Sequence, residues 1–192
     1  RGRKKRVGTI FSLLVFLVVI WTASNFFADL IINYDVSLFF AKIAYTSSSL
    51  MPLLLFYFSY IFPRGNFPAS KIKTFFIFLP PILISVFSFS DFIVASIEQK
   101  NYGINIITGT LYPVFVFLFI SYLIPTFINF WKRYKNSSGI DKQQIQYLLL
   151  GSFATSIGGV TFNILIPTLT GNFAYSKYGP YFAIFLVAFV GY

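Results

Sequence analysis

The chain has 192 residues, of which 57% are hydrophobic and 10% are charged, and its formal net charge is +10. Soluble globular proteins carry about 25% charged residues, so the charges here are too few to cover a water-facing surface. Several apolar stretches approach the roughly 20 residues that a helix needs to cross the hydrocarbon core of a bilayer. We therefore expect an all-α, polytopic membrane helix bundle that occupies residues 1–192 as one domain.

Neither cysteine nor histidine occurs in the sequence. Disulfides, thiolate nucleophiles, imidazole bases and a phospho-accepting histidine are therefore excluded within these residues. The chain starts at Arg1 and reaches Tyr192 inside an apolar run, so we expect a fragment of a longer protein. The basic start RGRKKR before an apolar run is similar to a signal peptide, but no convincing cleavage site follows, and we interpret the run as a retained span.

Six spans are predicted in this fragment. They cover residues 7–27, 43–62, 74–94, 111–130 and 145–166, and the sixth opens near Tyr181 and is cut off. The runs are apolar on all sides, which favours helices over the alternating strands of a barrel. Prolines inside the runs are expected to kink the helices, because neighbouring helices can satisfy the freed carbonyls. They are Pro52, Pro80, Pro81, Pro113 and Pro125.

The segment between the third and fourth spans, residues 95–110, is polar and contains β-branched residues around Asn101 and Gly103. This pattern predicts a short hairpin on the outer side. Two interpretations remain open, a plain connector and a lid over a binding site.

Basic residues are divided unequally between the two sides of the predicted topology. The N-terminal tail and the loops after the second and fourth spans carry 12 of the 15, and the other side carries Lys42, Lys100 and Lys177. The excess of positive charge on cytoplasmic loops predicts a multi-pass protein of the inner membrane with both fragment ends in the cytoplasm. Because the basic clusters lie directly against spans, we assign them to anionic lipid and expect no nucleic-acid partner.

Four polar residues are candidates for ligand binding. Asn25 and Asn163 lie within the first and fifth spans, where an unpaired amide costs several kcal/mol, so both should face the bundle interior. They form either interhelical hydrogen bonds or part of a ligand pocket. Asp29 and Lys42 are opposite charges near the same outer depth on adjacent antiparallel spans, and they either form a pair or extend separately to the headgroups.

Small residues follow one another at a four-residue spacing in the fifth span. Gly151, Thr155 and Gly159 are expected to share one helix face, with Ser152 and Ser156 beside them. Such a face lets another helix backbone approach closely, either within the bundle or at a dimer seam or movable contact.

Enzymatic chemistry has poor candidates in the sequence. Four of the five acids, Asp29, Asp35, Asp91 and Glu98, lie at the outer rim without a base among them. No catalytic residue, metal ligand or cofactor is predicted within the fragment. A carrier coupled to protons or ions would usually place an acid near mid-membrane, and none of the acids lies there.

Several short patterns occur in a particular order along nearly the whole chain. They are Trp21 ahead of Asn25, FFAKIAY at residues 39–45, Pro52 after Met51, FPR at 62–64, GTLY at 109–112, QIQYLLLG at 144–151, Asn163 before Pro167, and YGP at 178–180. In this order the chain resembles the N-terminal seven-transmembrane region of bacterial sensor histidine kinases. Lys42 stands where that family often has Arg, which keeps the charge.

The resemblance implies the sensory input module of a two-component system, in which an unknown stimulus or small ligand acts through the last span on a cytoplasmic kinase. It also implies a first span before residue 1, a homodimer formed through the kinase part, and catalytic residues that lie outside this fragment. Similar input regions precede diguanylate cyclases and other outputs, so the reaction downstream stays open. A small solute carrier is the alternative from another class, although the two halves show no convincing inverted repeat.

Overall fold

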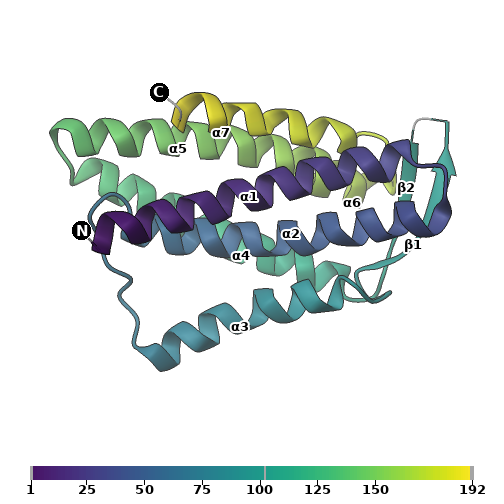
Figure 1. The fold of residues 1–192 in the computed structure, drawn as a ribbon, viewed down its shortest axis with the longest axis horizontal. Helices are drawn as coiled ribbons and strands as arrows, with labels where there is room; N and C mark the ends of the chain where they lie inside the picture. The colour runs from purple at the N-terminus through teal and green to yellow at the C-terminus, as the bar shows by residue number, and fades with distance from the viewer. Residues whose placement is uncertain (1, 102, 191–192) are drawn as a thin grey trace.

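Helices make up most of residues 2–101 and 103–190, which are the residues that the computed structural model describes. Their long axes run roughly together, and a β-hairpin lies at one end (Figure 1). The elements in chain order are α1 (Gly2–Leu30), α2 (Tyr34–Ile61), α3 (Lys71–Phe87), β1 (Val94–Lys100), β2 (Gly103–Thr108), α4 (Tyr112–Lys135), α5 (Gly139–Val160), the π-helix η1 (Thr161–Leu165), α6 (Ile166–Thr170), the 3₁₀-helix η2 (Ser176–Phe182) and α7 (Ala183–Val190).

The expected all-α membrane helix bundle is the architecture of the chain. Four helices are long and apolar enough to cross a bilayer, namely Lys5–Leu30, Tyr34–Ile61, Tyr112–Lys135 and Gly139–Thr170, and the last of these joins α5, η1 and α6. The helix at the third predicted span, α3, has 17 residues, and α7 has 8. The count of six spans is not confirmed and stays a prediction. The end of the sixth predicted span at Gly191 and Tyr192, like Arg1 of the basic tail, lies outside the described residues.

Side chains stabilise both ends of α2, which begins nine residues before the predicted second span at 43–62. α2 begins at Tyr34 because the side chain of Asn33 caps it, accepting a hydrogen bond from the amide of Val36 at 3.1 Å. At its other end, Arg133 of α4 donates hydrogen bonds to the carbonyl oxygens of Ser59 at 2.9 Å and Tyr60 at 2.6 Å, and also to that of Phe62. A helix leaves its last carbonyls without partners, and Arg133 supplies them for α2.

The predicted hairpin is confirmed. β1 and β2 pair antiparallel, with Val94 opposite Thr108 and Lys100 opposite Gly103. Gly103 has a φ of 124°, a conformation that favours glycine at this turn. Ile93 and Val94 are fully buried, so the start of the hairpin is part of the packed end of the bundle.

Hydrogen bonds hold the hairpin against three other segments. The Asp29 carboxylate at the end of α1 accepts the amide of Ile104 at 3.1 Å. The side-chain oxygen of Asn105 accepts the amide of Phe173 at 3.0 Å, and Gln99 donates to the carbonyl of Ile32. The hairpin is thereby fixed to the end of the bundle that lies away from the N-terminus (Figure 1).

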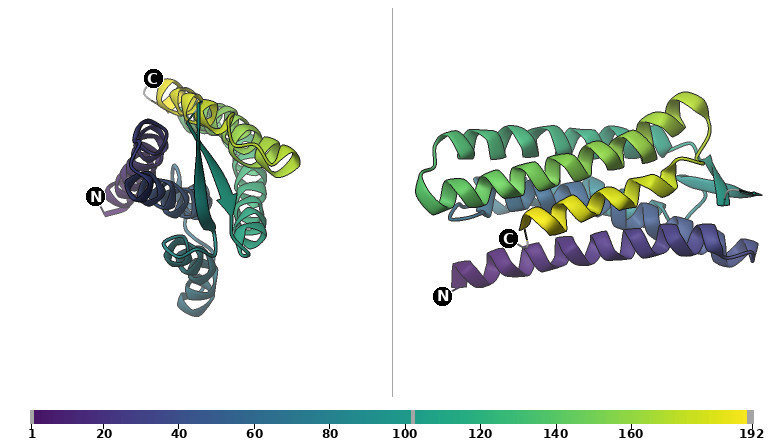
Figure 2. Two further views of the ribbon diagram at one scale, coloured as in Figure 1. Left: turned by 90° about the vertical axis from the view of Figure 1, so that its right-hand side faces the viewer. Right: turned by 90° about the horizontal axis from the view of Figure 1, so that it is seen from above.

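The segments that carry most of the basic residues lie at one end of the bundle. The N-terminus, the α2–α3 connection and the α4–α5 connection are at the end opposite the hairpin, and η2 and α7 run back toward that end (Figure 2). Large apolar side chains face outward along the bundle, for example Phe16, Phe75 and Phe117, which are 60%, 60% and 70% exposed. The chain is a multi-pass membrane protein, and these side chains form its lipid-facing surface.

Candidate functional site

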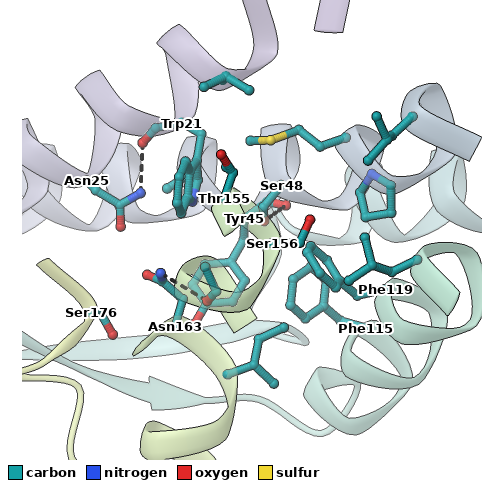
Figure 3. Close-up of a pocket in the computed structure, with 18 of the residues that line it drawn as sticks. Trp21, Asn25, Tyr45, Ser48, Phe115, Phe119, Thr155, Ser156, Asn163 and Ser176 are labelled. Carbon is teal, nitrogen blue, oxygen red and sulfur yellow. Dashed lines mark hydrogen bonds between the residues drawn. The ribbon is translucent and has the colours of Figure 1, made fainter. Parts of the chain in front are cut away.

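A cavity of about 110 Å³ lies inside the bundle. It is situated between two packed clusters, one near the N-terminal end that includes Phe58 and Phe130, and one near the hairpin that includes Ala28 and Ile93. Side chains from α1, α2, α4 and α5 converge on the space, as Figure 3 shows. Ile106 of β2 also lines it, so the hairpin forms part of the wall.

Helical periodicity brings the lining residues of α1 and α5 to the cavity. On α1 the lining positions are Leu14, Val18, Trp21 and Asn25, whose spacing of four, three and four residues keeps them on one helix face. On α5 the lining side chains are small, namely Ser152, Thr155, Ser156 and Gly159. These small side chains leave the space that larger ones would fill.

The two asparagines predicted from the sequence line the same cavity. Asn25 donates a hydrogen bond to the carbonyl of Trp21 at 2.7 Å, and Asn163 donates one to the carbonyl of Gly159 at 3.2 Å. Each bond lies within a single helical segment and uses one of the two amide hydrogens. Within residues 2–101 and 103–190, neither asparagine side chain forms a second hydrogen bond as donor, and neither side-chain oxygen accepts one.

Asn163 occupies an unusual stretch of helix. It lies in the π-helix η1, which interrupts the run from α5 to α6. Its amide also packs against Gly179 of η2, where a Cβ atom would collide with it. Short π-helical turns inside α-helices occur frequently at functional sites, and here the turn carries one of the few polar groups of the cavity.

Asp29 and Lys42 do not pair with each other, which was one of the two interpretations left open by the sequence. Lys42 forms an ion pair with Asp91 at 2.8 Å, and Asp29 accepts the amide of Ile104 instead. Asp29 lines a second space of about 20 Å³ beside the main cavity, and Lys42 lines neither. The structure thus brings Asn25 and Asn163 together at one site, with Asp29 at its outer edge and Lys42 outside it.

The small-residue face of α5 packs on the last helix. A Cβ built at Gly151 would lie 3.0 Å from the carbonyl oxygen of Phe185 and 3.4 Å from the Cα of Leu186. The hydroxyl of Thr155 donates to the carbonyl of Phe182 at 2.8 Å and accepts the amide of Leu186 at 3.1 Å. Since residues 182 and 186 are four apart, Thr155 is inserted into the hydrogen-bond ladder where η2 continues into α7.

The third residue of the predicted packing face has a different environment. A Cβ at Gly159 would meet no atom within 4 Å, and the residue faces the cavity. The close contact lies one position earlier, at Gly158, where a Cβ would overlap the ring of Phe182. The packing face is therefore formed by Gly151, Thr155 and Gly158.

Binding is the chemistry that the cavity supports. The lining residues among those described include no charged side chain. Within the same described ranges, no group of three or more acidic, histidine or cysteine residues is placed to hold a metal ion. General acid–base chemistry requires titratable groups that converge on a substrate, and Tyr45 is the single titratable side chain among the described residues of the wall.

Several lining residues were not among the ligand-binding candidates identified from the sequence. Tyr45 of α2, Phe115 and Phe119 of α4, and Ser156 of α5 all border the space (Figure 3). A helical-wheel comparison of the spans would have found part of this set, because Ser156 and Asn163 lie seven residues apart in an otherwise apolar run. The aromatic residues carry no such signal, since rings are frequent throughout this chain.

The chain matches the model of a known family. The family model described as the N-terminal 7TM region of histidine kinase matches residues 1–192, the whole chain. No curated protein and no solved structure matches.

Proposed function

The chain belongs to the family described as the N-terminal 7TM region of histidine kinase, and on that premise we propose that it is the membrane-embedded sensory input module of a two-component sensor histidine kinase. The main support for this proposal is the contact that Thr155 makes between the cavity and the last helix. Thr155 lines the cavity, and its hydroxyl is hydrogen-bonded into the backbone of the last helix between Phe182 and Leu186. Leu186 lines the same cavity, so an occupant would touch the last helix directly.

The proposed signal is a shift between two packings of α5 against η2 and α7. A ligand changes such an equilibrium only through unequal affinity for the two states, and moving it from 1:99 to 99:1 requires about 5.5 kcal/mol. The π-helix at Thr161–Leu165 supports this proposal, because π-helical turns occur frequently at functional sites. Asn163 lies in that turn and lines the cavity, so it would contact the occupant.

The proposed orientation places the basic end of the bundle in the cytoplasm of a bacterial cell with the inner membrane as its location. The unequal distribution of lysine and arginine supports it. The last helix runs toward the end where α1 begins (Figure 2), so the shift would be delivered to a cytoplasmic kinase. We also propose that the whole receptor forms a homodimer through its kinase part.

The experiment uses the kinase that carries this region, reconstituted in nanodiscs, and measures its autophosphorylation rate. Gly159→Leu should change the basal rate several-fold, because the new side chain occupies the cavity and favours one packing. Phe153→Leu is the matched control, since Phe153 is 48% exposed on the outer face of the same helix. Equal rates for wild type, Gly159→Leu and the control would contradict the proposal.

A nucleotide-cyclase output is the alternative that keeps the input role. It would be recognised by cyclase activity that responds to Gly159→Leu in the same way. Transport of a solute by vesicles that contain the protein, without any catalytic output, would replace the sensory proposal with a carrier.

A further inference from the structure

We propose that the cavity binds a small uncharged molecule, no larger than a single ring or a short chain, that is mostly apolar and carries at least one hydrogen-bonding group. The inference rests on the proposed function only in treating the cavity as the sensory site. Binding itself requires no kinase and can be measured separately.

The volume of the cavity limits the size of the ligand. An engineered protein cavity of about 150 Å³ lined by apolar side chains binds benzene. The cavity here is smaller, at about 110 Å³, so at most a single ring or a short chain fits it, whereas a sterol or a quinone does not. Trp21, Tyr45, Phe115 and Phe119 form much of the wall (Figure 3), and aromatic rings pack well against a planar ligand edge or face.

The chemistry of the wall excludes a charged ligand. A bare ion inside a bundle loses its hydration and needs a partner of opposite charge. No charged side chain is present among the described residues that line the space. The nearest acid at its outer edge, Asp29, borders only the smaller space and is already hydrogen-bonded to the amide of Ile104.

Polar groups in the wall favour a ligand with a hydroxyl or carbonyl over a pure hydrocarbon. The hydroxyls of Ser152 and Thr155 are engaged with backbone carbonyls. The Ser156 side chain has no hydrogen bond to the described parts of the chain, and Figure 3 shows it beside Phe115 and Phe119. A ligand hydroxyl at Ser156 would satisfy a polar group that an apolar ligand would leave unpaired.

The chain contains a built-in reporter for occupancy. It has two tryptophans, and Trp21 lines the cavity whereas Trp131 is 51% exposed on α4. Trp131→Phe therefore leaves a single tryptophan at the site. Bromine quenches tryptophan emission at short range, so 4-bromophenol, a single ring that is uncharged at neutral pH and carries one hydroxyl, is a suitable probe.

The test titrates 4-bromophenol into the protein in phospholipid vesicles, which add no tryptophan of their own, in the Trp131→Phe background. We expect a saturable loss of Trp21 emission in addition to the linear quenching that partitioning into lipid produces. Gly159→Leu should remove the saturable part, and Phe153→Leu should keep it. The anion 4-bromobenzoate should give no saturable part. Ser156→Ala should weaken binding of 4-bromophenol about three- to tenfold and leave binding of bromobenzene unchanged.

Linear quenching by 4-bromophenol in both the parent background and Gly159→Leu would overturn the inference, and so would saturable quenching by 4-bromobenzoate. These outcomes are distinguishable from failure of the proposed function. If Gly159→Leu alters kinase output while 4-bromophenol shows no saturable quenching, the ligand class is wrong and the sensory role stands. If quenching is saturable while kinase output never responds to the cavity, the ligand class stands and the sensory role fails.

Discussion

Two adjacent glycines on α5 should respond in opposite ways to the same substitution. A methyl group at position 158 would overlap the ring of Phe182, whereas a methyl group at position 159 would meet no atom within 4 Å. Gly158→Ala therefore has to displace η2 from α5 or tilt the Phe182 ring. Gly159→Ala only reduces the cavity slightly.

Two contributions determine how far the two variants differ in their free energy of unfolding. One applies to both positions, and the other applies to Gly158 alone. Replacing glycine with alanine inside a helix stabilises it by about 0.8–1 kcal/mol, and this gain applies to both positions. Overpacking a filled contact costs about 1–3 kcal/mol, and this cost applies to Gly158 alone. We therefore expect the free energy of unfolding of Gly158→Ala to be lower than that of Gly159→Ala by about 1–3 kcal/mol.

The assay is reversible unfolding in mixed detergent micelles with increasing dodecyl sulfate, followed by helical circular dichroism. Both variants are compared with the wild type in the same lipid and detergent. Gly159→Ala should equal or exceed the wild type in stability. Equal stability of the two variants, or a lower stability for Gly159→Ala, would refute the assignment of the packing contact to Gly158.

Three further changes test other parts of the account. Cysteines introduced at Glu98 and at Ser138 in the cysteine-free chain should be labelled in intact cells only at 98, and labelling at 138 would reverse the proposed orientation. Thr155→Val should lower the free energy of unfolding by about 0.6–1.7 kcal/mol, while Thr155→Ser should retain most of it, because the hydroxyl bridges two helices. Arg133→Met should cost about 2 kcal/mol through loss of the carbonyl contacts at the end of α2, and Lys132→Met, on the exposed neighbour, should cost far less.

Much of the bundle could be predicted because membrane helices are governed by composition and length. The first, second, fourth and fifth predicted spans correspond to helices that can cross a bilayer. The hairpin after α3 was predictable from its polar, β-branched composition. Asn25 and Asn163 could be identified as interior residues because an amide needs polar partners in an apolar medium, and both line one cavity.

The sequence did not show which glycine of α5 makes the close contact, because this depends on the helical register. A spacing of four residues leads from Gly151 to Thr155 and then to Gly159, but an α-helix turns by about 100° per residue. Seven residues return to within about 20° of the starting face, and eight lie roughly 80° from it. Gly158 therefore faces η2, and Gly159 faces the cavity.

Contacts between segments that are distant in the chain could not be predicted from the sequence either. Lys42 pairs with Asp91, which follows α3, because the hairpin approaches the end of α1 and occupies Asp29. The π-helical turn at Thr161–Leu165 has no compositional signal. Both features depend on how the helices pack, which local patterns do not record.

In the proposed function, occupancy of the cavity changes kinase activity because α5 moves relative to α7. A Cβ built at Gly151 lies 2.9 Å from the Cβ of Phe189, and a small shift reaches the 3.5–4.5 Å that is typical of a disulfide. Gly151→Cys with Phe189→Cys can therefore lock the two helices together, and the region offers no other cysteine.

The decisive measurement is autophosphorylation of the kinase in nanodiscs, with and without Gly159→Leu, in this double-cysteine background. The single variant Gly151→Cys under the same oxidant is the control. We expect Gly159→Leu to change the autophosphorylation rate before the cysteines are crosslinked and to have no effect on it once they are crosslinked. After the disulfide is reduced again, the effect should return. A change of rate of the same size in the crosslinked and reduced proteins would contradict the claim.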